Sequence, residues 1–349
     1  MRAVPDGVYL CPSVGEYPVY DELIYSVISG DEQRNRLFRR AIAAAAPGAT
    51  VLEIGPGPDL LWTLAAAEAG AARVYAVEVL AESARLAVET AARRGTACVE
   101  VVTGEATALT LPERADVCVA EIVGCIGGAE GMAAVLGDAE RRHLVEGAQV
   151  IPAAVRTLVA AVSLAGVLGP EPVLASVFGP YVEGIFRAVG GPFDVRFCLA
   201  GVGPEMLRSS PAVLEDLRFG AARGGQPGSR GGDLRLEITR GGPVDALLAW
   251  IELTVAPGDR PLDSLADDTN WLPVCIPFAG GPVAAGPGDV LSVRATVSEA
   301  ADGIHPEYFF RGELAPADGR PGVPVHAESR FAGGPLRATP LHRALLRQP

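Results

Sequence analysis

The pattern of hydrophobic and polar positions changes once along the chain, close to Pro152. Between residues 46 and 152, short apolar runs alternate with alanine-rich stretches of helical length. The first such unit consists of an apolar run at 51–54, a helical stretch at 60–69 and a second run at 73–78. Strands that alternate with helices in this way are typical of a parallel sheet.

Beyond Pro152 the apolar positions fall into strand-like runs separated by turns rich in glycine and proline, which favour an antiparallel barrel or sandwich. These runs are residues 155–162, 195–199, 234–239, 247–255 and 290–297. A glycine-rich stretch at 224–232 is expected to be a loop. Residues 1–45 contain helical segments, and we expect them to form a lid. The pattern therefore predicts a helical segment at 1–45, an α/β domain at 46–152 and a β domain at 153–349.

Composition limits the partners and the compartment. With 349 residues, of which 49% are hydrophobic, the chain is long enough for two domains with cores. It has no apolar run of about 18 residues and no signal-peptide pattern, so we expect neither a membrane span nor secretion. Six scattered cysteines and four dispersed histidines favour a reduced, cytoplasmic protein without a metal site. The net charge of −13 disfavours nucleic acid as a partner and suits cationic substrates.

A glycine turn between two predicted strands is the first candidate binding site. The run at 51–54 contains Glu53 and is followed by Gly55-x-Gly57, and the next run ends at Glu78. Glycines at a strand-to-helix turn let a ligand approach the backbone closely. An acid at the end of the second strand, roughly 20 residues further on, is placed to accept hydrogen bonds from ribose hydroxyls. The pattern indicates a cofactor that contains a nucleoside.

Two features of this turn favour S-adenosylmethionine over a dinucleotide. The dinucleotide fingerprint places a small residue three positions after the second glycine, where this chain has Leu60. The carboxylate of Glu53 would also repel a pyrophosphate, whereas it suits a ligand with a cationic or amino group.

Two glutamates nine residues apart, Glu121 and Glu130, form the second candidate site. They follow a predicted buried strand at 115–119, so Glu121 lies at the carboxyl end of a strand, where open α/β sheets bind their ligands. The glycines between them let the chain fold back, so both carboxylates can converge. Two converging carboxylates suit a planar cation that donates several hydrogen bonds, as a guanidinium does.

Together these motifs resemble those of the protein arginine methyltransferases, and the resemblance covers most of the chain. The matched positions are Glu121, Gly124, Glu130 and Met132 in the acidic hairpin loop, Glu53, Gly55, Gly57 and Glu78 in the cofactor site, residues 28–35 in the N-terminal helix signature, and Thr269-Asn270-Trp271 in the Thr-His-Trp loop. The resemblance implies a Rossmann-like S-adenosylmethionine-dependent methyltransferase domain, then an antiparallel β-barrel with a dimerisation arm at about 165–192. A homodimer follows from the arm. Residues 31–35 and 143–146 look most like the monomethylating branch.

The resemblance also implies roles for individual residues. Glu121 and Glu130 would be the catalytic acids. The cofactor would be held by Arg34, Glu53, Gly55, Gly57, Glu78, Glu105, Ala106 and Thr107. Within that set Arg34 would bind the methionine carboxylate. The substrate would contact Tyr25, Asn270 and Trp271.

Three positions depart from the family pattern. Asn270 replaces a histidine that pairs with an acid matching Asp31, so a hydrogen bond can remain but a charge pair cannot. Asp59 replaces the third glycine of the cofactor turn, and it tolerates the left-handed conformation better than most residues. Thr107 replaces a glutamate on the adenine side. These departures leave open the alternative that the protein is a catalytically inactive binding partner of the same fold. The intact acidic pair and Arg34 are evidence against this alternative.

The resemblance leaves the substrate as free L-arginine or a protein arginine. All 29 basic residues are arginine, which is typical of a G- and C-rich coding sequence such as those of soil actinobacteria. Such a source favours small-molecule metabolism, and the chain is similar to bacterial enzymes that methylate free L-arginine in N-nitrosourea biosynthesis. We therefore expect free L-arginine as substrate and Nω-methyl-L-arginine as product, with a protein or peptide arginine as the alternative.

Overall fold

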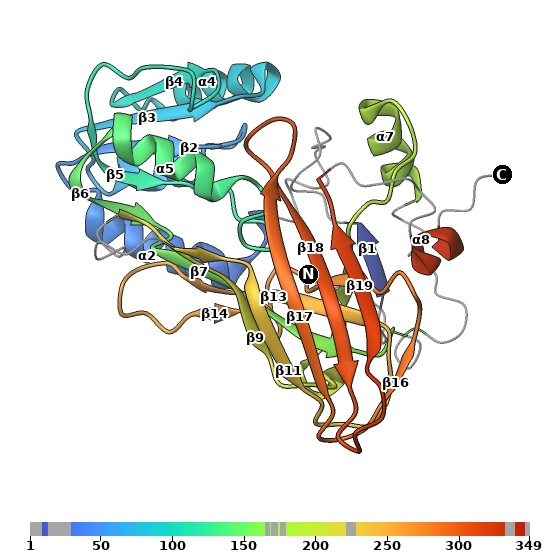
Figure 1. The fold of residues 1–349 in the computed structure, drawn as a ribbon. Helices are drawn as coiled ribbons and strands as arrows, with labels where there is room; N and C mark the ends of the chain where they lie inside the picture. The colour runs from blue at the N-terminus through green and yellow to red at the C-terminus, as the bar shows by residue number, and fades with distance from the viewer. Residues whose placement is uncertain are drawn as a thin grey trace.

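A five-stranded parallel sheet with flanking helices forms one half of the molecule (Figure 1). The computed structural model describes residues 9–12, 29–164, 168, 174, 179–220, 228–331 and 339–345. The sheet has the order β4-β3-β2-β5-β6, and every neighbouring pair is parallel. Its strands are β2 (Thr50–Ile54), β3 (Arg73–Glu78), β4 (Val99–Thr103), β5 (Ala115–Val119) and β6 (Leu144–Ile151). The helices are α2 (Glu32–Ala45), α3 (Leu61–Glu68), α4 (Ala81–Arg94) and α5 (Met132–Arg142).

Antiparallel sheets form the other half. One has the order β1-β8-β15-β13-β7-β9-β10 with β14 paired to β13, and another has the order β11-β17-β18-β19. Their strands are β1 (Tyr9–Pro12), β7 (Ala154–Val162), β8 (Phe197–Ala200), β9 (Ala212–Arg218), β10 (Ser229–Arg230), β11 (Gly232–Glu237), β13 (Ala246–Thr254), β14 (Leu262–Asp263), β15 (Val274–Pro277), β17 (Val290–Glu299), β18 (Pro306–Ala315) and β19 (Val323–Ser329). A separate ribbon pairs β12 (Gly242–Val244) with β16 (Val283–Ala285), and the remaining helices are α7 (Gly179–Val189), a 3₁₀ turn at Pro204–Met206 and α8 (Pro340–Leu345).

Bridges between Ser209 and Ile238 and between Phe278 and Ala327 join the two large antiparallel sheets. The sheets therefore close toward a barrel, and the predicted fold class, a parallel α/β unit followed by an antiparallel β-barrel, is confirmed. None of the helices among the described residues is long and apolar enough to cross a membrane.

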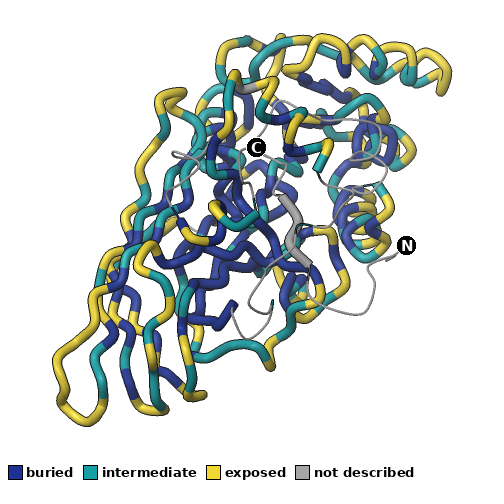
Figure 2. The backbone as a smooth tube through the Cα atoms, turned by 90° about the vertical axis from the view of Figure 1, so that its right-hand side faces the viewer, coloured by how far each residue is buried: buried dark blue, intermediate teal, exposed yellow. Residues whose placement is uncertain are grey.

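The sequence patterns explain the two kinds of strand. The central strand β13 carries an unbroken apolar run and is buried almost throughout, since it has neighbours on both edges and both faces. Strand β17 alternates buried and exposed positions over most of its length, because one of its faces meets solvent. Buried backbone runs through the middle of the molecule, and exposed positions gather at the ends of the long hairpins (Figure 2).

Two segments differ from expectation. Residues 9–12, inside the segment expected to be helical, form β1 and pair antiparallel with β8. They complete the edge of β8, which has β15 on its other side. Ser229 and Arg230, expected in a loop, form β10 and pair with Asp216 and Glu215 of β9.

Helix α2 and the barrel share one core with the parallel sheet. Asp31 caps the helix, and its buried face includes Phe38 and Ile42. The ring of Phe38 stacks on Trp62 of α3 with centroids 4.8 Å apart. The same apolar cluster continues to Leu253 of the barrel strand β13. The candidate site lies beside this shared core.

Candidate functional site

The predicted cofactor residues gather at the carboxyl edge of the parallel sheet. Glu53 lies near the end of β2, Glu78 is the last residue of β3, residues 105–107 follow β4, and Glu121 follows β5. Because the strands are parallel, their carboxyl ends lie along one edge, where this fold class binds ligands. The sheet therefore brings together residues that are widely separated in sequence.

The turn after β2 has the backbone of a close-approach site. Gly55 and Gly57 adopt φ values of 73° and 65°, in the left-handed region that favours glycine. The carboxylate of Glu78 accepts hydrogen bonds from the Gly57 N–H at 3.0 Å and from the Leu80 N–H at 2.9 Å. A Cβ added to Gly55 would lie 3.3 Å from Cγ2 of Ile122. The turn thus lies directly beside the segment that begins at Glu121.

Besides the glycines, the residue of this turn with a left-handed backbone is Leu60, whereas Asp59, at the position of the family's third glycine, has no positive φ. Leu60 has φ 56° and ψ 40° immediately before α3, and its side chain is fully buried. A left-handed L-residue costs roughly 1–2 kcal/mol. Packing of Leu60 against Leu64 and Ala76 offsets this cost, whereas Asp59 remains exposed.

Glu53 is a buried acid with an unsatisfied oxygen. The hydroxyl of Thr63 donates to Oε2, while Oε1 has no hydrogen-bond partner within the described part of the chain. Burial, helped by the charges of Glu121 and Glu78, raises the pKa of Glu53 to about 8, against the lowering effect of the hydrogen bonds from Thr63. Glu53, Glu78 and Glu121 therefore lie close enough to repel one another. A cluster of acids fits a ligand that carries positive charge or amino donors.

Arg34 supplies the cation among these acids. Its Nη1 donates to Oε2 of Glu121 at 2.9 Å, and its Nε and Nη2 donate to Oδ1 of Asn35 at 3.2 and 3.0 Å. The guanidinium also stands over the ring of Trp62, 5.4 Å from its centroid. Burial raises the pKa of Glu121 above its ordinary value, and the charge of Arg34 opposes that rise.

The acidic loop, residues 121–130, folds back on itself. The Ala129 N–H donates to the Ile126 carbonyl at 2.8 Å, and the Gly131 N–H donates to the Gly128 carbonyl at 3.0 Å. At Gly124 an added Cβ would lie 2.9 Å from Cβ of Ala129, too close for any other residue. The glycines therefore permit the close return of the chain toward its start, with Glu130 on the returning limb.

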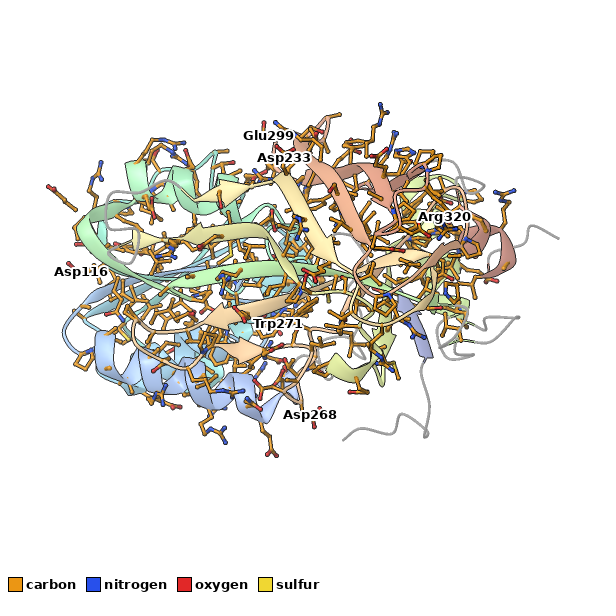
Figure 3. All side chains as sticks on the ribbon, turned by 60° about the horizontal axis from the view of Figure 1, so that its bottom comes forward. Asp116, Asp233, Asp268, Trp271, Glu299 and Arg320 are labelled. Carbon is orange, nitrogen blue, oxygen red and sulfur yellow. The ribbon has the colours of Figure 1, made fainter. Side chains whose placement is uncertain are left out.

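The tryptophan loop, residues 269–271, is tied to α2 and to the acidic loop. Oδ2 of Asp31 accepts from the Thr269 hydroxyl at 2.7 Å and from the Asn270 backbone N–H at 2.9 Å. The indole of Trp271 donates to the Val123 carbonyl at 2.7 Å. Figure 3 shows Trp271 in the interior of the molecule and Asp268 at its periphery. Thr269 and Trp271 are buried, whereas Asn270 is exposed. The loop is therefore held by Asp31 through Thr269 and the backbone.

The remaining predicted residues lie apart from these contacts or outside the described chain. The Thr107 hydroxyl donates to Glu105 at 3.0 Å, and the Ala106 carbonyl accepts from Arg142 at 2.9 Å, which fixes the turn after β4. Tyr25 lies outside the described residues, as do most positions between 165 and 178 of the predicted arm.

Three residues of the site were not predicted as such: Asn35, Trp62 and Thr63. Asn35 belongs to the quoted helix signature, directly beside Arg34, so its position was a usable signal. Trp62 and Thr63 begin α3 just after the glycine turn, where side chains point back over the preceding turn.

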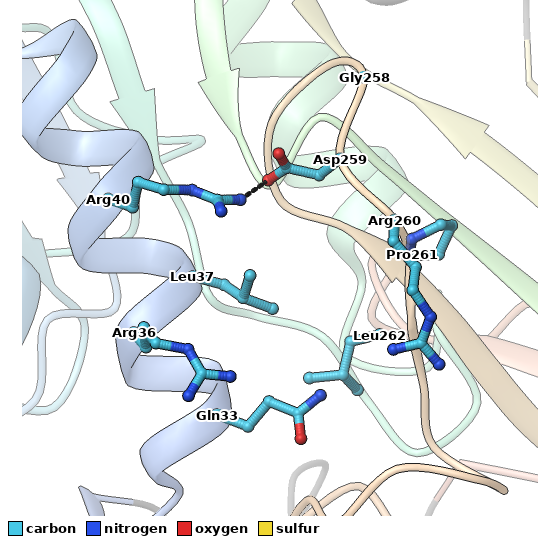
Figure 4. Close-up of a pocket in the computed structure, with 9 residues that line it drawn as sticks. All are labelled: Gln33, Arg36, Leu37, Arg40, Gly258, Asp259, Arg260, Pro261 and Leu262. Atoms are coloured by element: carbon cyan, nitrogen blue, oxygen red, sulfur yellow. Dashed lines mark hydrogen bonds and ion pairs between the residues drawn. The ribbon is translucent and has the colours of Figure 1, made fainter.

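A surface cavity of about 260 Å³ lies between α2 and the connection from β13 to β14. It is lined by Gln33, Arg36, Leu37, Arg40 and residues 258–262, none of them a predicted site residue (Figure 4). There Arg40 forms an ion pair with Asp259 at 2.6 Å. This contact is a second link between α2 and the barrel.

Solved structures share this architecture. The chain superposes on Arabidopsis thaliana protein arginine methyltransferase 10, in a uniquely open conformation, with TM-score 0.68 and 18% identity, covering 88% of this chain and 97% of that one. The enzyme–prozyme heterotetrameric complex of Trypanosoma brucei protein arginine methyltransferase 1 with AdoHcy gives TM-score 0.66 and 17% identity, covering 88% and 98%. At these identities the likeness shows a shared fold, an α/β domain followed by a β-barrel.

A relative with higher sequence identity shows the family. The arginine N(omega)-methyltransferase of Streptomyces achromogenes subsp. streptozoticus is 32% identical over 276 residues, which cover 76% of this chain and 73% of the relative. The chain therefore belongs to the arginine methyltransferase family, whose members are S-adenosylmethionine-dependent enzymes. No protein-family model matches the chain.

Proposed function

We propose that the protein methylates the guanidino group of free L-arginine, giving Nω-methyl-L-arginine, in bacterial secondary metabolism. The acidic loop carries this proposal: Glu121 and Glu130 lie on a folded-back segment beside the glycine turn, and Glu121 already bonds one guanidinium, that of Arg34, at 2.9 Å. The Streptomyces relative, named for arginine Nω-methylation, supports the same substrate class.

The residues at the sheet edge fit S-adenosylmethionine, which supplies a methyl group activated by a sulfonium. Arg34 is placed to hold the methionine carboxylate. Glu53, with its unsatisfied Oε1, is suited to the amino group, and Glu78 to the ribose hydroxyls. Gly55 and Gly57 allow the close backbone approach.

The two acids of the loop make a guanidinium stable in this buried place. A guanidinium stays protonated because its pKa exceeds about 12, so it enters the site as a cation. Bringing a cation next to another positive centre away from water is costly unless anions offset it. Glu121 and Glu130 supply those anions and orient one terminal nitrogen for in-line attack. With the cofactor bound, the methyl group would pass from the sulfonium sulfur, which leaves as a neutral thioether, to the guanidinium nitrogen. A carboxylate of the loop would accept the proton that this nitrogen releases.

We further propose a cytoplasmic homodimer. Five free cysteines among the described residues support a reducing compartment. The dimer is proposed through the arm around α7; Ile185 of that helix is buried in the chain's own barrel, and Phe186 is half-buried. Light scattering at micromolar concentration should give twice the mass of the chain, and a monomer would contradict the dimer.

Mass spectrometry of one reaction tests the substrate. Purified protein is mixed with S-adenosylmethionine, free L-arginine and a peptide rich in arginine and glycine. We expect free arginine alone to become one methyl group heavier. Methylation of the peptide alone would move the function to protein modification. No product from either, with cofactor bound, would favour a different amine substrate or the inactive binding partner.

A further inference from the structure

The returning limb of the acidic loop rests on a buried carboxylate of the barrel, Glu215 of β9. This side chain is fully buried. Its Oε2 accepts hydrogen bonds from the Gly128 N–H at 3.1 Å and from the Thr157 hydroxyl at 2.9 Å. Its Oε1 accepts from the Tyr308 hydroxyl at 3.1 Å. Both oxygens are thus fixed, and one of them holds the acidic loop.

A second bond runs beside the first. The hydroxyl oxygen of Thr157, on β7, accepts from the Gly127 N–H at 3.0 Å. Two successive backbone N–H groups of the loop are therefore bonded to barrel side chains that are themselves bonded to each other. The Gly128 carbonyl in turn accepts from the Gly131 N–H at 3.0 Å, closing the turn that contains Glu130. The position of Glu130 is thus linked to Glu215 through one short turn of backbone.

The fit between loop and barrel requires the two glycines. A Cβ added to Gly128 would lie 2.7 Å from Oε1 of Glu215, and one added to Gly127 would lie 2.7 Å from Cγ2 of Val155. Any other residue at either position would force the loop or the facing barrel side chain to shift. The paired glycines therefore let the loop come within hydrogen-bond distance of a carboxylate inside the barrel.

Burying the carboxylate of Glu215 costs free energy, so it is a poor means of stabilising the barrel interior. Its removal from water must be offset by hydrogen bonds and by a cation, here Arg230, whose Nε lies 3.5 Å from Oε1. An apolar side chain of similar volume would stabilise a barrel interior as well or better. An apolar residue cannot accept a hydrogen bond from the Gly128 N–H. The loss of this bond therefore distinguishes a residue that positions the loop from one that only packs in the barrel.

We propose that Glu215, assisted by Thr157, is a positioning residue that fixes Glu130 for methyl transfer. This inference rests on the proposed function, since it takes Glu130 as one of the two acids that bind the substrate guanidinium. Cofactor binding, which depends on the sheet edge, should not depend on Glu215.

Four variants test the inference: Glu215→Met, which keeps the volume but loses the acceptor, Thr157→Val, Thr157→Ser, and Glu252→Met as a control. Glu252 is a carboxylate of the same sheet that bonds Arg156 and makes no bond to the acidic loop. We expect Glu215→Met and Thr157→Val to lower kcat about 10- to 100-fold, the range for a misplaced catalytic group, with an unchanged Kd for S-adenosylmethionine. Thr157→Ser keeps the hydroxyl and should restore most of kcat, and Glu252→Met should match the wild type in kcat.

Hydrogen exchange of the protein without ligands gives a readout that does not depend on activity. Peptides covering residues 122–131 should exchange faster in Glu215→Met and Thr157→Val, while those from the parallel sheet should not change. Unchanged kcat with unchanged exchange would overturn the inference, and so would faster exchange across the whole barrel, which indicates a structural role. If the wild type methylates no form of arginine, the proposed function fails. Hydrogen exchange still tests whether Glu215 and Thr157 hold the acidic loop in place.

Discussion

The two limbs of the acidic loop are held in different ways. The limb at Glu121 is held by charge and by motif residues: Arg34 bonds the carboxylate and Trp271 bonds the Val123 carbonyl. The limb at Glu130 is held through backbone N–H groups that reach into the barrel, chiefly to Glu215. The Glu121 limb is thus held by Arg34 of α2 and by the tryptophan loop, and the Glu130 limb by side chains inside the barrel.

This difference shows how a site between two structural units can be divided. The first limb is bonded by Arg34, which is proposed to bind the cofactor, so we expect its geometry to be coupled to cofactor binding. The second limb depends on a contact that is independent of the cofactor. Variants at the two limbs should therefore fail in different ways.

The largest effect should come from removing both charges. Glu121→Gln and Glu130→Gln should each lower turnover by about 10²-fold or more, as does loss of a preorganised electrostatic partner, and the double variant should be inactive. The fold and the binding of S-adenosylmethionine should remain, as circular dichroism and calorimetry can verify. Retained turnover in the double variant would exclude these residues as the catalytic acids.

Stability against pH tests the acid cluster beside Glu121. The folded-state pKa of Glu53 is about 8, against an ordinary value of 4.5. Between these values the folded protein binds more protons than the unfolded chain, so stability falls as the pH rises from about 4.5 to about 8. At about 1.36 kcal/mol per pKa unit the fall amounts to several kcal/mol.

Glu53→Gln should abolish this part of the pH dependence, measured by urea unfolding across that range. Glu68→Gln serves as the control because Glu68 is exposed on α3, the helix that follows the same turn. An identical pH slope in wild type and Glu53→Gln would show that Glu53 ionises normally in the folded protein.

Weakening the first limb alone should affect the cofactor. Arg34→Lys keeps the charge but loses the planar fork that bonds Glu121 and Asn35 together. We expect the Kd for S-adenosylmethionine, measured by calorimetry, to rise about 10- to 100-fold, the loss of one or two charge-assisted bonds. Arg36→Lys, at an exposed position of the same helix, should bind like the wild type. Equal affinities in the two variants would exclude Arg34 from the cofactor site.

The smallest effect is expected at Asn270. Asp31 already accepts from Thr269 and from the Asn270 backbone, so a histidine side chain at this exposed position has little to add. Asn270→His should change the free energy of unfolding by less than about 1 kcal/mol. Thr269→Val removes a buried bond to a carboxylate and should cost about 1.5–3 kcal/mol. The reverse order of the two effects in thermal unfolding would mean that the side chain at 270 holds the loop.

The cofactor half could be predicted from sequence because its determinants are local. A strand, a glycine turn and an acid at a set spacing place Glu53, Gly55 and Glu78 with little freedom, and the parallel sheet then collects the strand ends. Even here one local detail was missed, since the left-handed residue is Leu60, whose burial overrides its backbone preference.

The support from the barrel could not be predicted, because it depends on long-range pairing. Glu215 lies in β9, which was not among the predicted runs, and nothing in its local sequence marks a buried acid. It becomes buried only when Thr157 and Tyr308, from strands distant in sequence, meet it beneath Gly128. The short β1 was missed for the same reason, since its partner β8 is nearly 200 residues away.

A crystal structure with S-adenosylhomocysteine and free L-arginine would test the central claim most directly. The predicted result is one guanidinium bonded to both Glu121 and Glu130, with nitrogen–oxygen distances of about 2.7–2.9 Å, as expected for charge-assisted bonds. Arginine bound away from the acidic loop, or bonded to neither carboxylate, would contradict it.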